Sequence, residues 1–311
     1  MLYLPFCPEH GIRIHKTGFV YFNSLTKENI ATATKRNLMF NASFYLENFL
    51  GQAGKIESQR LCYENSEDAV TFNIFTELLG KSYALKKLIG QITKANAQEG
   101  TELYLWGGKI DLKNNRLSQY NPLIEVRRHL EPDIVKFVTE PDIMLVVPKK
   151  VLVCIEAKFG SKNPPAEEIE EGFDEKPKSR AKLIERYCKK NPIINYNEIF
   201  AFSDMPRVFY EQLFRNVVFA ASMAKLTGIE KWYVVNLRSQ HVINFKRGKP
   251  ESMPVVRNVR KILRPMYKKR FLHFTWEDLY YGIVNGDTEL HDLAWYMKNK
   301  TLRCGRAFNV F

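Results

Sequence analysis

Residues 140–161, EPDIMLVVPKKVLVCIEAKFGS, constrain the fold of this chain more than any other stretch. Two apolar runs of strand length flank a short basic turn at residues 148–150, and this pattern predicts a buried β-hairpin. The hairpin nevertheless opens on Asp142 and closes on Glu156 and Lys158. Charged side chains are costly to bury unless they are paired or bind a metal, so these three residues are expected to do more than pack.

The register of the hairpin decides whether these charges meet. Residues i and i+2 of a strand point to the same face, so Glu156 and Lys158 share one face. If Lys149 is the centre of the turn, Asp142 lies directly opposite Glu156, because both are seven residues from that centre. Directly opposite residues have Cβ atoms about 5 Å apart. Two carboxylates and one ammonium group are therefore predicted to converge on a small patch.

Two carboxylates at this separation repel each other unless a proton or a cation lies between them. A divalent metal removes the conflict, and ligation by oxygen alone favours a hard ion such as Mg²⁺. Such a site activates water and stabilises a phosphoryl group, while the lysine supplies further positive charge. The combination indicates phosphodiester hydrolysis. A purely structural salt-bridge cluster is the competing interpretation, but desolvation offsets its attraction and two acids beside one lysine leave excess negative charge.

Pro141–Asp142, followed across the apolar hairpin by the tripeptide at residues 156–158, resembles the PD-(D/E)xK nuclease superfamily, to which restriction endonucleases belong. The resemblance covers about residues 66–238. It implies an α/β fold with a three-layer α/β/α restriction-endonuclease-like core, a central mixed β-sheet, and N- and C-terminal additions. It also implies a Mg²⁺-dependent DNA endonuclease, with Mn²⁺ as a substitute ion, in which Asp142, Glu156 and Lys158 are catalytic. Asp142, Glu156 and the backbone carbonyl of Ala157 are the implied metal ligands.

Members of this superfamily commonly add an acidic residue from the helix that precedes the hairpin. Ser66 is a predicted N-cap, and Glu67 falls within the apolar sector of the helix that follows, while Glu77 lies at the rim of that sector. Glu67 is therefore predicted as a further catalytic and metal-binding residue, with Glu77 as the second choice. First-turn acids are also favoured by the helix dipole alone, so an ordinary structural role stays open.

Many members also direct a glutamine or arginine toward the site from the helix that follows the hairpin. In the helix predicted within residues 208–228, Gln212 takes this position and is predicted to be catalytic. Whether Arg215 joins it is left open, as is the interpretation of both as the polar face of an amphipathic helix.

Two further motifs compete with this assignment. Pairing Asp133 of a second Glu-Pro-Asp sequence with Glu156 would place the turn centre inside the apolar run, so Asp133 is expected in a neighbouring strand or turn. Cys7, His10 and His15 resemble half of a zinc site, but no second Cys/His pair follows at a suitable spacing. The role of Cys7 and His10 stays open.

The charge balance indicates the partner. The chain has 47 Lys and Arg against 34 Asp and Glu, a net charge of +13 that favours a polyanion, and the resemblance makes DNA the expected one. The basic run at residues 257–270 suits phosphate contacts and equally suits a solvated helix face. A catalytically silent nuclease-like fold that binds DNA, or a nuclease that acts on RNA, are the alternative functions.

The remaining sequence features predict location and organisation. Scattered cysteines, no signal peptide and no apolar run of about 18 residues predict a cytoplasmic protein without a membrane partner. We expect an N-terminal extension over residues 1–60, packed on a nuclease core over 61–245, and a basic and aromatic extension over 246–311. Many such endonucleases pair two active sites, so a homodimer is left open.

Overall fold

A seven-stranded mixed β-sheet forms the centre of the computed structural model, which describes residues 6–9, 11–15, 18–21, 26–39, 60–94, 100–111, 118–134, 138–161, 177–200, 210–240, 252–302 and 305–311. Its strand order is β10-β9-β8-β7-β4-β5-β6. The strands are β4 (Glu102–Leu105), β5 (Gly108–Lys109), β6 (Ser118–Gln119), β7 (Ile143–Val147), β8 (Val151–Lys158), β9 (Lys231–Arg238) and β10 (Phe271–Thr275). β8, β9 and β10 run parallel, and the other neighbours are antiparallel.

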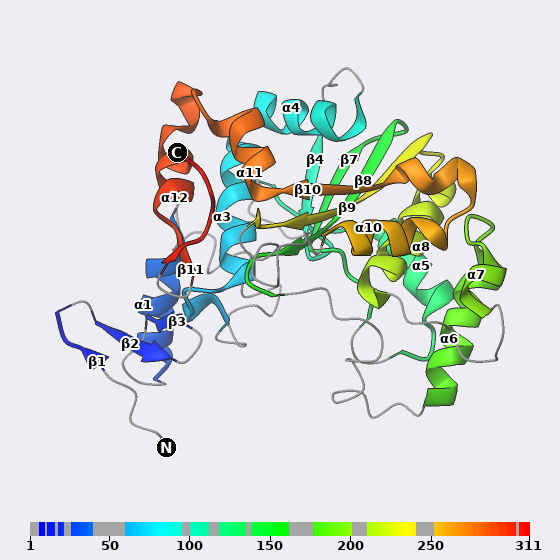
Figure 1. Cartoon of the computed structure of the whole chain (residues 1–311), viewed down its shortest axis with the longest axis horizontal. Coiled ribbons are helices and arrows are strands. Elements are labelled where there is room, and N and C mark those ends of the chain that lie inside the picture. Colours follow the sequence, from blue (N-terminus) through cyan, green and yellow to red (C-terminus); the bar gives the residue numbers. More distant parts are fainter. Residues whose placement is uncertain are drawn as a thin grey trace.

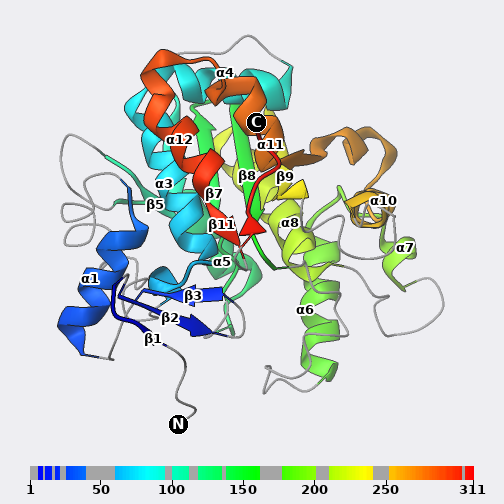
Figure 2. The ribbon, with the colours of Figure 1, turned by 60° about the vertical axis from the view of Figure 1, so that its left-hand side comes forward.

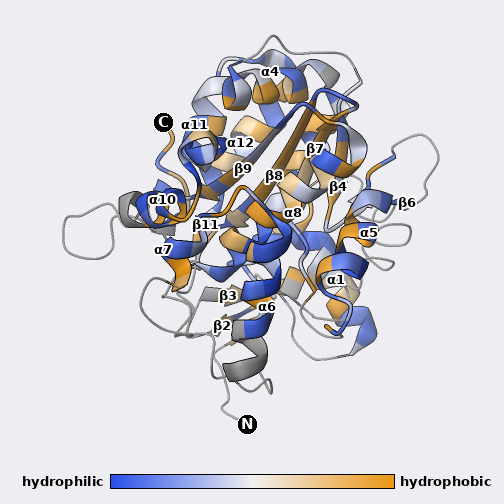
Figure 3. Cartoon of the chain, turned by 90° about the vertical axis from the view of Figure 1, so that its right-hand side faces the viewer, coloured by the Kyte–Doolittle hydropathy of each residue, from blue (hydrophilic) through white to orange (hydrophobic). Residues whose placement is uncertain are grey.

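Helices cover both faces of this sheet, as Figures 1 and 2 show. One layer holds α5 (Asn121–Leu130), α6 (Pro177–Lys190), α7 (Tyr196–Phe200), α8 (Glu211–Thr227) and α10 (Ser252–Lys261). The other holds α3 (Glu67–Gly80), α4 (Ser82–Thr93), α11 (Trp276–Leu279), the π-helical η5 (Tyr280–Val284) and α12 (His291–Asn299). Burial on both faces explains why β7 and residues 151–155 of β8 are apolar, which Figure 3 makes visible. The predicted three-layer α/β/α arrangement is confirmed.

α3 begins after its predicted N-cap, and α8 ends at its predicted glycine. The hydroxyl of Ser66 accepts a hydrogen bond from the backbone N–H of Ala69 (3.1 Å) and caps α3. α8 ends at Gly228, whose φ of 67° is the left-handed conformation that glycine adopts without a steric penalty. Across the described part of the chain, no helix has both the length and the apolar character needed to cross a bilayer.

The hairpin at residues 102–109 turns on a tryptophan and a glycine. Two glycines, Gly107 and Gly108, suggest a glycine-glycine turn, but Leu105 pairs with Gly108, so the turn residues are Trp106 and Gly107. Trp106 has a φ of 49°, which costs a non-glycine residue roughly 1 kcal/mol. Its ring is buried in the core and its backbone N–H donates to the carbonyl of Asp142 (3.0 Å), contacts that offset this strain.

The chain beyond residue 245 contributes to the central sheet. β10 pairs in parallel with β9 and forms the edge of the sheet. The indole N–H of Trp276 donates to the carbonyl of Lys158 (3.2 Å), and the buried carboxylate of Glu277 accepts from the N–H groups of Gln240 (3.0 Å) and Asn309 (3.1 Å). The domain boundaries at residues 60 and 245 stay predictions, but this segment supplies part of the core that supports the hairpin.

The described N-terminal part packs on α3 and α12. It contains β1 (Phe6–Cys7), β2 (Ile12–His15), β3 (Gly18–Val20) and α1 (Lys27–Asn37). Asn37, at the end of α1, accepts a hydrogen bond at its carbonyl from the amide of Asn73 on α3 (2.9 Å). Its side-chain oxygen accepts from the ammonium of Lys300 (3.1 Å), which follows α12. A buried polar cluster therefore joins the two ends of the chain.

Lys300 makes the stability of this junction depend on pH. Burial lowers the pKa of Lys300 from 10.5 to about 8, although the charge of Glu64 opposes the shift. Between these two values the folded state releases its proton first, so the free energy of unfolding of the wild type rises with pH in this window. Lys300→Met should stabilise the fold by about 2 kcal/mol at neutral pH, where the buried charge is present, and this advantage should shrink toward the upper end of the window. Urea unfolding at both ends of the window tests this, with the exposed Lys298→Met as control; an equal effect at both ends would contradict it.

Candidate active site

The turn between β7 and β8 sets the predicted register. Ile143 pairs with Ile155 and Val147 with Val151, so Lys149 is the centre of the turn. Continuing this register by one residue places Asp142 opposite Glu156, as predicted. Asp142 is held in place, because its Oδ2 accepts a hydrogen bond from the backbone N–H of Ala157 (2.9 Å).

Glu156 and Lys158 form the centre of the cluster at the carboxyl end of β8. The ammonium of Lys158 lies 2.7 Å from Oε1 of Glu156. Oε2 of Glu156 accepts a hydrogen bond from the side-chain amide of Asn216 on α8 (2.8 Å). Glu156 is only 3% exposed and Lys158 7%, so both charges are held in fixed positions away from bulk water.

Glu67 reaches the cluster from the opposite helical layer. Its position in the first turn of α3 brings Oε1 to 3.4 Å from the ammonium of Lys158. Its Oε2 accepts hydrogen bonds from the backbone N–H of Phe159 and the hydroxyl of Ser161, both at 2.8 Å. The structure therefore brings Glu67 to the cluster through Lys158, and its catalytic and metal-binding role stays a prediction. Glu77, the second choice, lies on a later turn of α3, where burial raises its pKa although the charge of Lys81 opposes the shift.

The electrostatics of the cluster reflect an excess of negative charge. Burial and the charge of Glu156 raise the pKa of Asp142 well above 3.8, although Lys158 and the N–H of Ala157 oppose this. Burial lowers the pKa of Lys158, but the charges of Glu156, Glu67 and Asp142 outweigh burial and raise it above 10.5. Lys158 is therefore a cation, and one ammonium group does not fully compensate three carboxylates.

The donor set fits a hard divalent ion. Asp142, Glu156 and the carbonyl of Ala157 offer only oxygen atoms, and the repulsion that raises the pKa of Asp142 is what a cation would relieve. In the part of the chain that the structure describes, no three His, Cys, Asp or Glu side chains are gathered closely enough to hold a metal by themselves. Cys7 lies in β1, whereas His10 falls outside the described residues. The half-site for zinc therefore stays a hypothesis.

Asn216, rather than Gln212, contacts Glu156 from α8. Gln212 is exposed at the start of α8, and Asn216, one helical turn later on the same face, contacts Glu156. Gln212 and Asn216 are four residues apart and lie on the same face of the helix. The sequence alone therefore does not say which of the two reaches Glu156. Arg215 points to a different partner and belongs to a second network.

Asn216→Ala is expected to lower the rate of the reaction at this site by about 10–100-fold, because second-layer partners that orient metal-binding carboxylates typically contribute this much. Gln212→Ala, the matched change one turn earlier, should change the rate by less than about twofold. Single-turnover kinetics on both variants measure this difference. A larger loss for Gln212→Ala than for Asn216→Ala would contradict the assignment.

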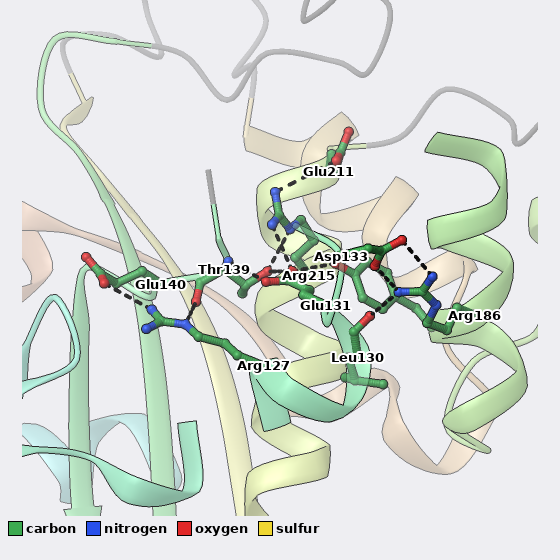
Figure 4. A network of polar contacts seen from close by, with 10 residues as sticks. Arg127, Leu130, Glu131, Asp133, Thr139, Glu140, Arg186, Glu211 and Arg215 are labelled. Carbon is green, nitrogen blue, oxygen red and sulfur yellow. Dashed lines mark hydrogen bonds and ion pairs between the residues drawn. The ribbon is translucent and has the colours of Figure 1, made fainter. Parts of the chain in front are cut away.

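A second polar network fixes the backbone immediately before Asp142 (Figure 4). The buried carboxylate of Glu131 accepts hydrogen bonds from the backbone N–H and the hydroxyl of Thr139, from Arg215 (2.8 Å) and from Tyr187 (2.5 Å). Arg215 also donates to the hydroxyl of Thr139 (2.7 Å). Burial raises the pKa of Glu131, but Arg215 and these hydrogen bonds outweigh burial and lower it below 4.5. The network ties Thr139 to α5, α6 and α8.

Arg127 and Asp133 complete this network at the surface. Arg127 donates to the carbonyl of Thr139 (2.8 Å) and to the carboxylate of Glu140 (3.0 Å), the two residues that precede Pro141. Asp133 lies in a turn and pairs with Arg186 (2.5 Å), so it takes no part in the hairpin. Sequence reasoning placed Asp133 correctly outside the hairpin but did not single out Glu131 or Thr139.

A pocket of about 290 Å³ opens beside Glu67. It lies at the amino end of α3, and Tyr63, in the segment that precedes α3, lines part of it. The lining residues are Tyr63, Asn65, Ser66, Glu67, Asp68, Gly160 and Ser161.

A mixed sheet between two helical layers, with an acid-acid-lysine cluster at the hairpin, defines a restriction-endonuclease-like fold. A family described as "Restriction Endonuclease associating with ARP" (REase-ARP) matches residues 9–300, and the chain belongs to this family. The resemblance to restriction endonucleases is thereby confirmed. Comparisons with curated proteins and with solved structures gave no match.

Proposed function

We propose that the chain is a divalent-metal-dependent DNA endonuclease. Asp142, Glu156 and Lys158 are the proposed catalytic residues for the hydrolysis of phosphodiester bonds. The observation that carries the proposal is the opposition of Asp142 and Glu156 across the hairpin, with the ammonium of Lys158 at 2.7 Å from Glu156. Membership in a restriction-endonuclease family supports nuclease activity. The net charge of +13 supports a polyanionic substrate.

Asp142, Glu156 and the carbonyl of Ala157 are the proposed ligands of Mg²⁺, with Mn²⁺ as a substitute. When bound there, the ion supplies Lewis-acid activation of water and neutralises charge on the phosphoryl oxygens. Glu67 is a proposed fourth member of the site. Its contact with Lys158 at 3.4 Å favours a role in which it holds the ammonium group, and direct ligation of the metal is the alternative role.

The chain's own residues then supply orientation and charge. Lys158 places a positive charge where negative charge develops on the phosphoryl group in the transition state, and it orients the attacking water. The N–H of Ala157 and the amide of Asn216 fix the carboxylates of Asp142 and Glu156, so little reorganisation is needed when substrate binds. No covalent nucleophile is required.

Two alternatives differ in the reaction rather than in the fold. A catalytically silent relative would bind DNA without cutting it, but the cluster retains both carboxylates and the lysine. An RNA nuclease would use the same chemistry, because nothing in the cluster distinguishes the sugars. A cytoplasmic location and a homodimer are further proposals; the free thiols of Cys7, Cys62, Cys154 and Cys188 suit a reducing compartment.

The test is cleavage of four labelled substrates, namely supercoiled plasmid, linear duplex, single-stranded DNA and RNA, each with Mg²⁺, Mn²⁺ or EDTA. The proposal predicts metal-dependent cutting of DNA and none in EDTA. Cutting of RNA alone would replace DNA with RNA as the substrate. Binding of DNA without cutting under all conditions would establish the silent alternative.

A further inference from the structure

A basic cluster lies at the end of the sheet opposite the active site. The β7–β8 turn carries Lys149 and Lys150, both exposed, and the N–H of Lys231 at the start of β9 donates to the carbonyl of Lys150 (3.1 Å). The 3₁₀ helix η4 (Pro265–Arg270) precedes β10 and ends next to β9. We call this surface the basic edge; its members are Lys149, Lys150, Lys231, Lys268, Lys269 and Arg270.

Strand pairing places the basic edge far from the catalytic cluster. Val151 pairs with Lys231 at this end of β8 and β9, and Lys158 pairs with Arg238 at the other end. These two pairs are seven residues apart along the strands, which corresponds to about 23 Å. Cations at the basic edge are therefore too far away to neutralise a phosphate group in the active site formed by Asp142 and Glu156.

The conformation of Lys149 is unfavourable for a lysine. Its φ of 63° lies in the left-handed region, where glycine or asparagine is preferred and other residues cost roughly 1 kcal/mol. The N–H of Lys150 donates to the carbonyl of Val147 (3.0 Å), which closes the turn and would do so equally with glycine at position 149. The turn thus presents a charge at its tip at the expense of stability.

Arg270 is fixed on an aromatic platform. Its guanidinium lies over the rings of Trp232 (5.8 Å) and Tyr233 (5.4 Å) and donates to the carbonyl of Trp232 (3.3 Å). The ring of Tyr267 stacks on that of Trp232, with centroids 6.1 Å apart. These contacts hold η4 against β9 and present Lys268 and Lys269 to solvent.

Stability does not account for this concentration of charge. Like charges at neighbouring positions repel each other, and exposed ion pairs contribute at most about 1 kcal/mol. In the segments 148–151, 229–232 and 264–271, Glu230 is the one acidic residue. The centres of protein interfaces are depleted in lysine, whereas sequence-independent phosphate contacts are made by lysine and arginine.

We propose that the basic edge binds the phosphate backbone of DNA outside the stretch that is cleaved. The inference rests on the proposed DNA substrate and adds a second contact, about 23 Å from the first. Through it the protein holds DNA in a way that increases affinity without contributing to the chemical step.

Binding of a labelled duplex of about four helical turns, measured by fluorescence anisotropy in EDTA over a range of salt concentrations, tests the proposal without cleavage. The triple variant Lys149→Gln/Lys268→Gln/Lys269→Gln is compared with Lys87→Gln/Lys189→Gln/Lys298→Gln, which removes the same charge at exposed positions elsewhere. The edge variant should bind at least about tenfold more weakly at low salt and lose about 2.7 from the slope of log K against log salt. The control variant should lose less than about 1 from that slope.

Equal effects of the two triple variants would overturn the proposal, because net charge would then explain the binding of DNA. Unchanged binding by the edge variant would also overturn it, and the basic edge would then be a site for an acidic protein partner or a solvated surface. The single-turnover cleavage rate at saturating protein should be the same for the edge variant and the wild type. If the wild type binds DNA through the basic edge but does not cut it, the proposed function fails and this inference stands. If the wild type cuts DNA but the edge variant binds DNA as the wild type does, this inference fails and the proposed function stands.

Discussion

Lys158→Ala is expected to lower the rate of DNA cleavage by about 10²–10³-fold, because removing one group that stabilises transition-state charge typically has this effect. The change also removes the cation that Glu156 and Glu67 share, so metal alone should not restore the rate. Single-turnover cleavage with saturating Mg²⁺ measures the loss, and binding of the same DNA in EDTA should change by less than about threefold.

A matched control separates chemistry from general charge and from folding. Lys189→Ala removes an exposed lysine that pairs with Glu185 (2.6 Å) and should leave the rate unchanged. Lys158→Met keeps most of the length of the side chain and should lose activity as Lys158→Ala does. Circular dichroism confirms that each variant is folded, and cutting by a folded Lys158→Met at the wild-type rate would remove Lys158 from the mechanism.

Arg215→Met is expected to destabilise the fold by about 3–5 kcal/mol, the largest effect on stability that we expect from one substitution. Arg215 is 8% exposed and Glu131 4%, so the change leaves a buried carboxylate without its counter-charge. The pKa of Glu131 is lowered in the folded state, so the contribution of the pair is present above pH 4.5 and is lost as the pH falls through the folded-state value. Urea unfolding at neutral pH measures the effect.

The double variant Arg215→Met/Glu131→Gln should recover part of this loss, because no charge then stays buried. Arg186→Met is the control, since Asp133, the partner of Arg186, is exposed and the pair should contribute less than about 1 kcal/mol. If Arg215→Met is no more destabilising than Arg186→Met, the network around Thr139 does not hold the hairpin in place.

The hairpin register was predictable because only short-range rules decide it. A turn of three residues, Pro148–Lys150, leaves little freedom, and the two-residue period of a strand then assigns each side chain to a face. Glu67 was predictable for a similar reason, since the N-cap Ser66 fixes where α3 begins and therefore which residues lie in its first turn.

Contacts that depend on how an element crosses the sheet were not predictable. Gln212 and Asn216 share one face of α8, and only the placement of the helix over β8 decides which of them lies above Glu156. Trp106 took a turn position that its backbone preference disfavours, because burial of its ring outweighs the strain. The place of β10 at the sheet edge likewise depends on tertiary packing rather than on its own sequence.

The two Pro-Asp sequences of this chain allow the most direct test of the central claim. Asp142→Asn and Asp133→Asn are identical chemical changes on either side of Thr139, one in the cluster and one in an exposed ion pair with Arg186. Conversion of supercoiled plasmid to nicked and linear forms is followed for both variants and the wild type, in Mg²⁺ and in EDTA. We predict Mg²⁺-dependent cutting by the wild type and by Asp133→Asn and none by Asp142→Asn; cutting by Asp142→Asn at the wild-type rate would contradict the assignment of the active site.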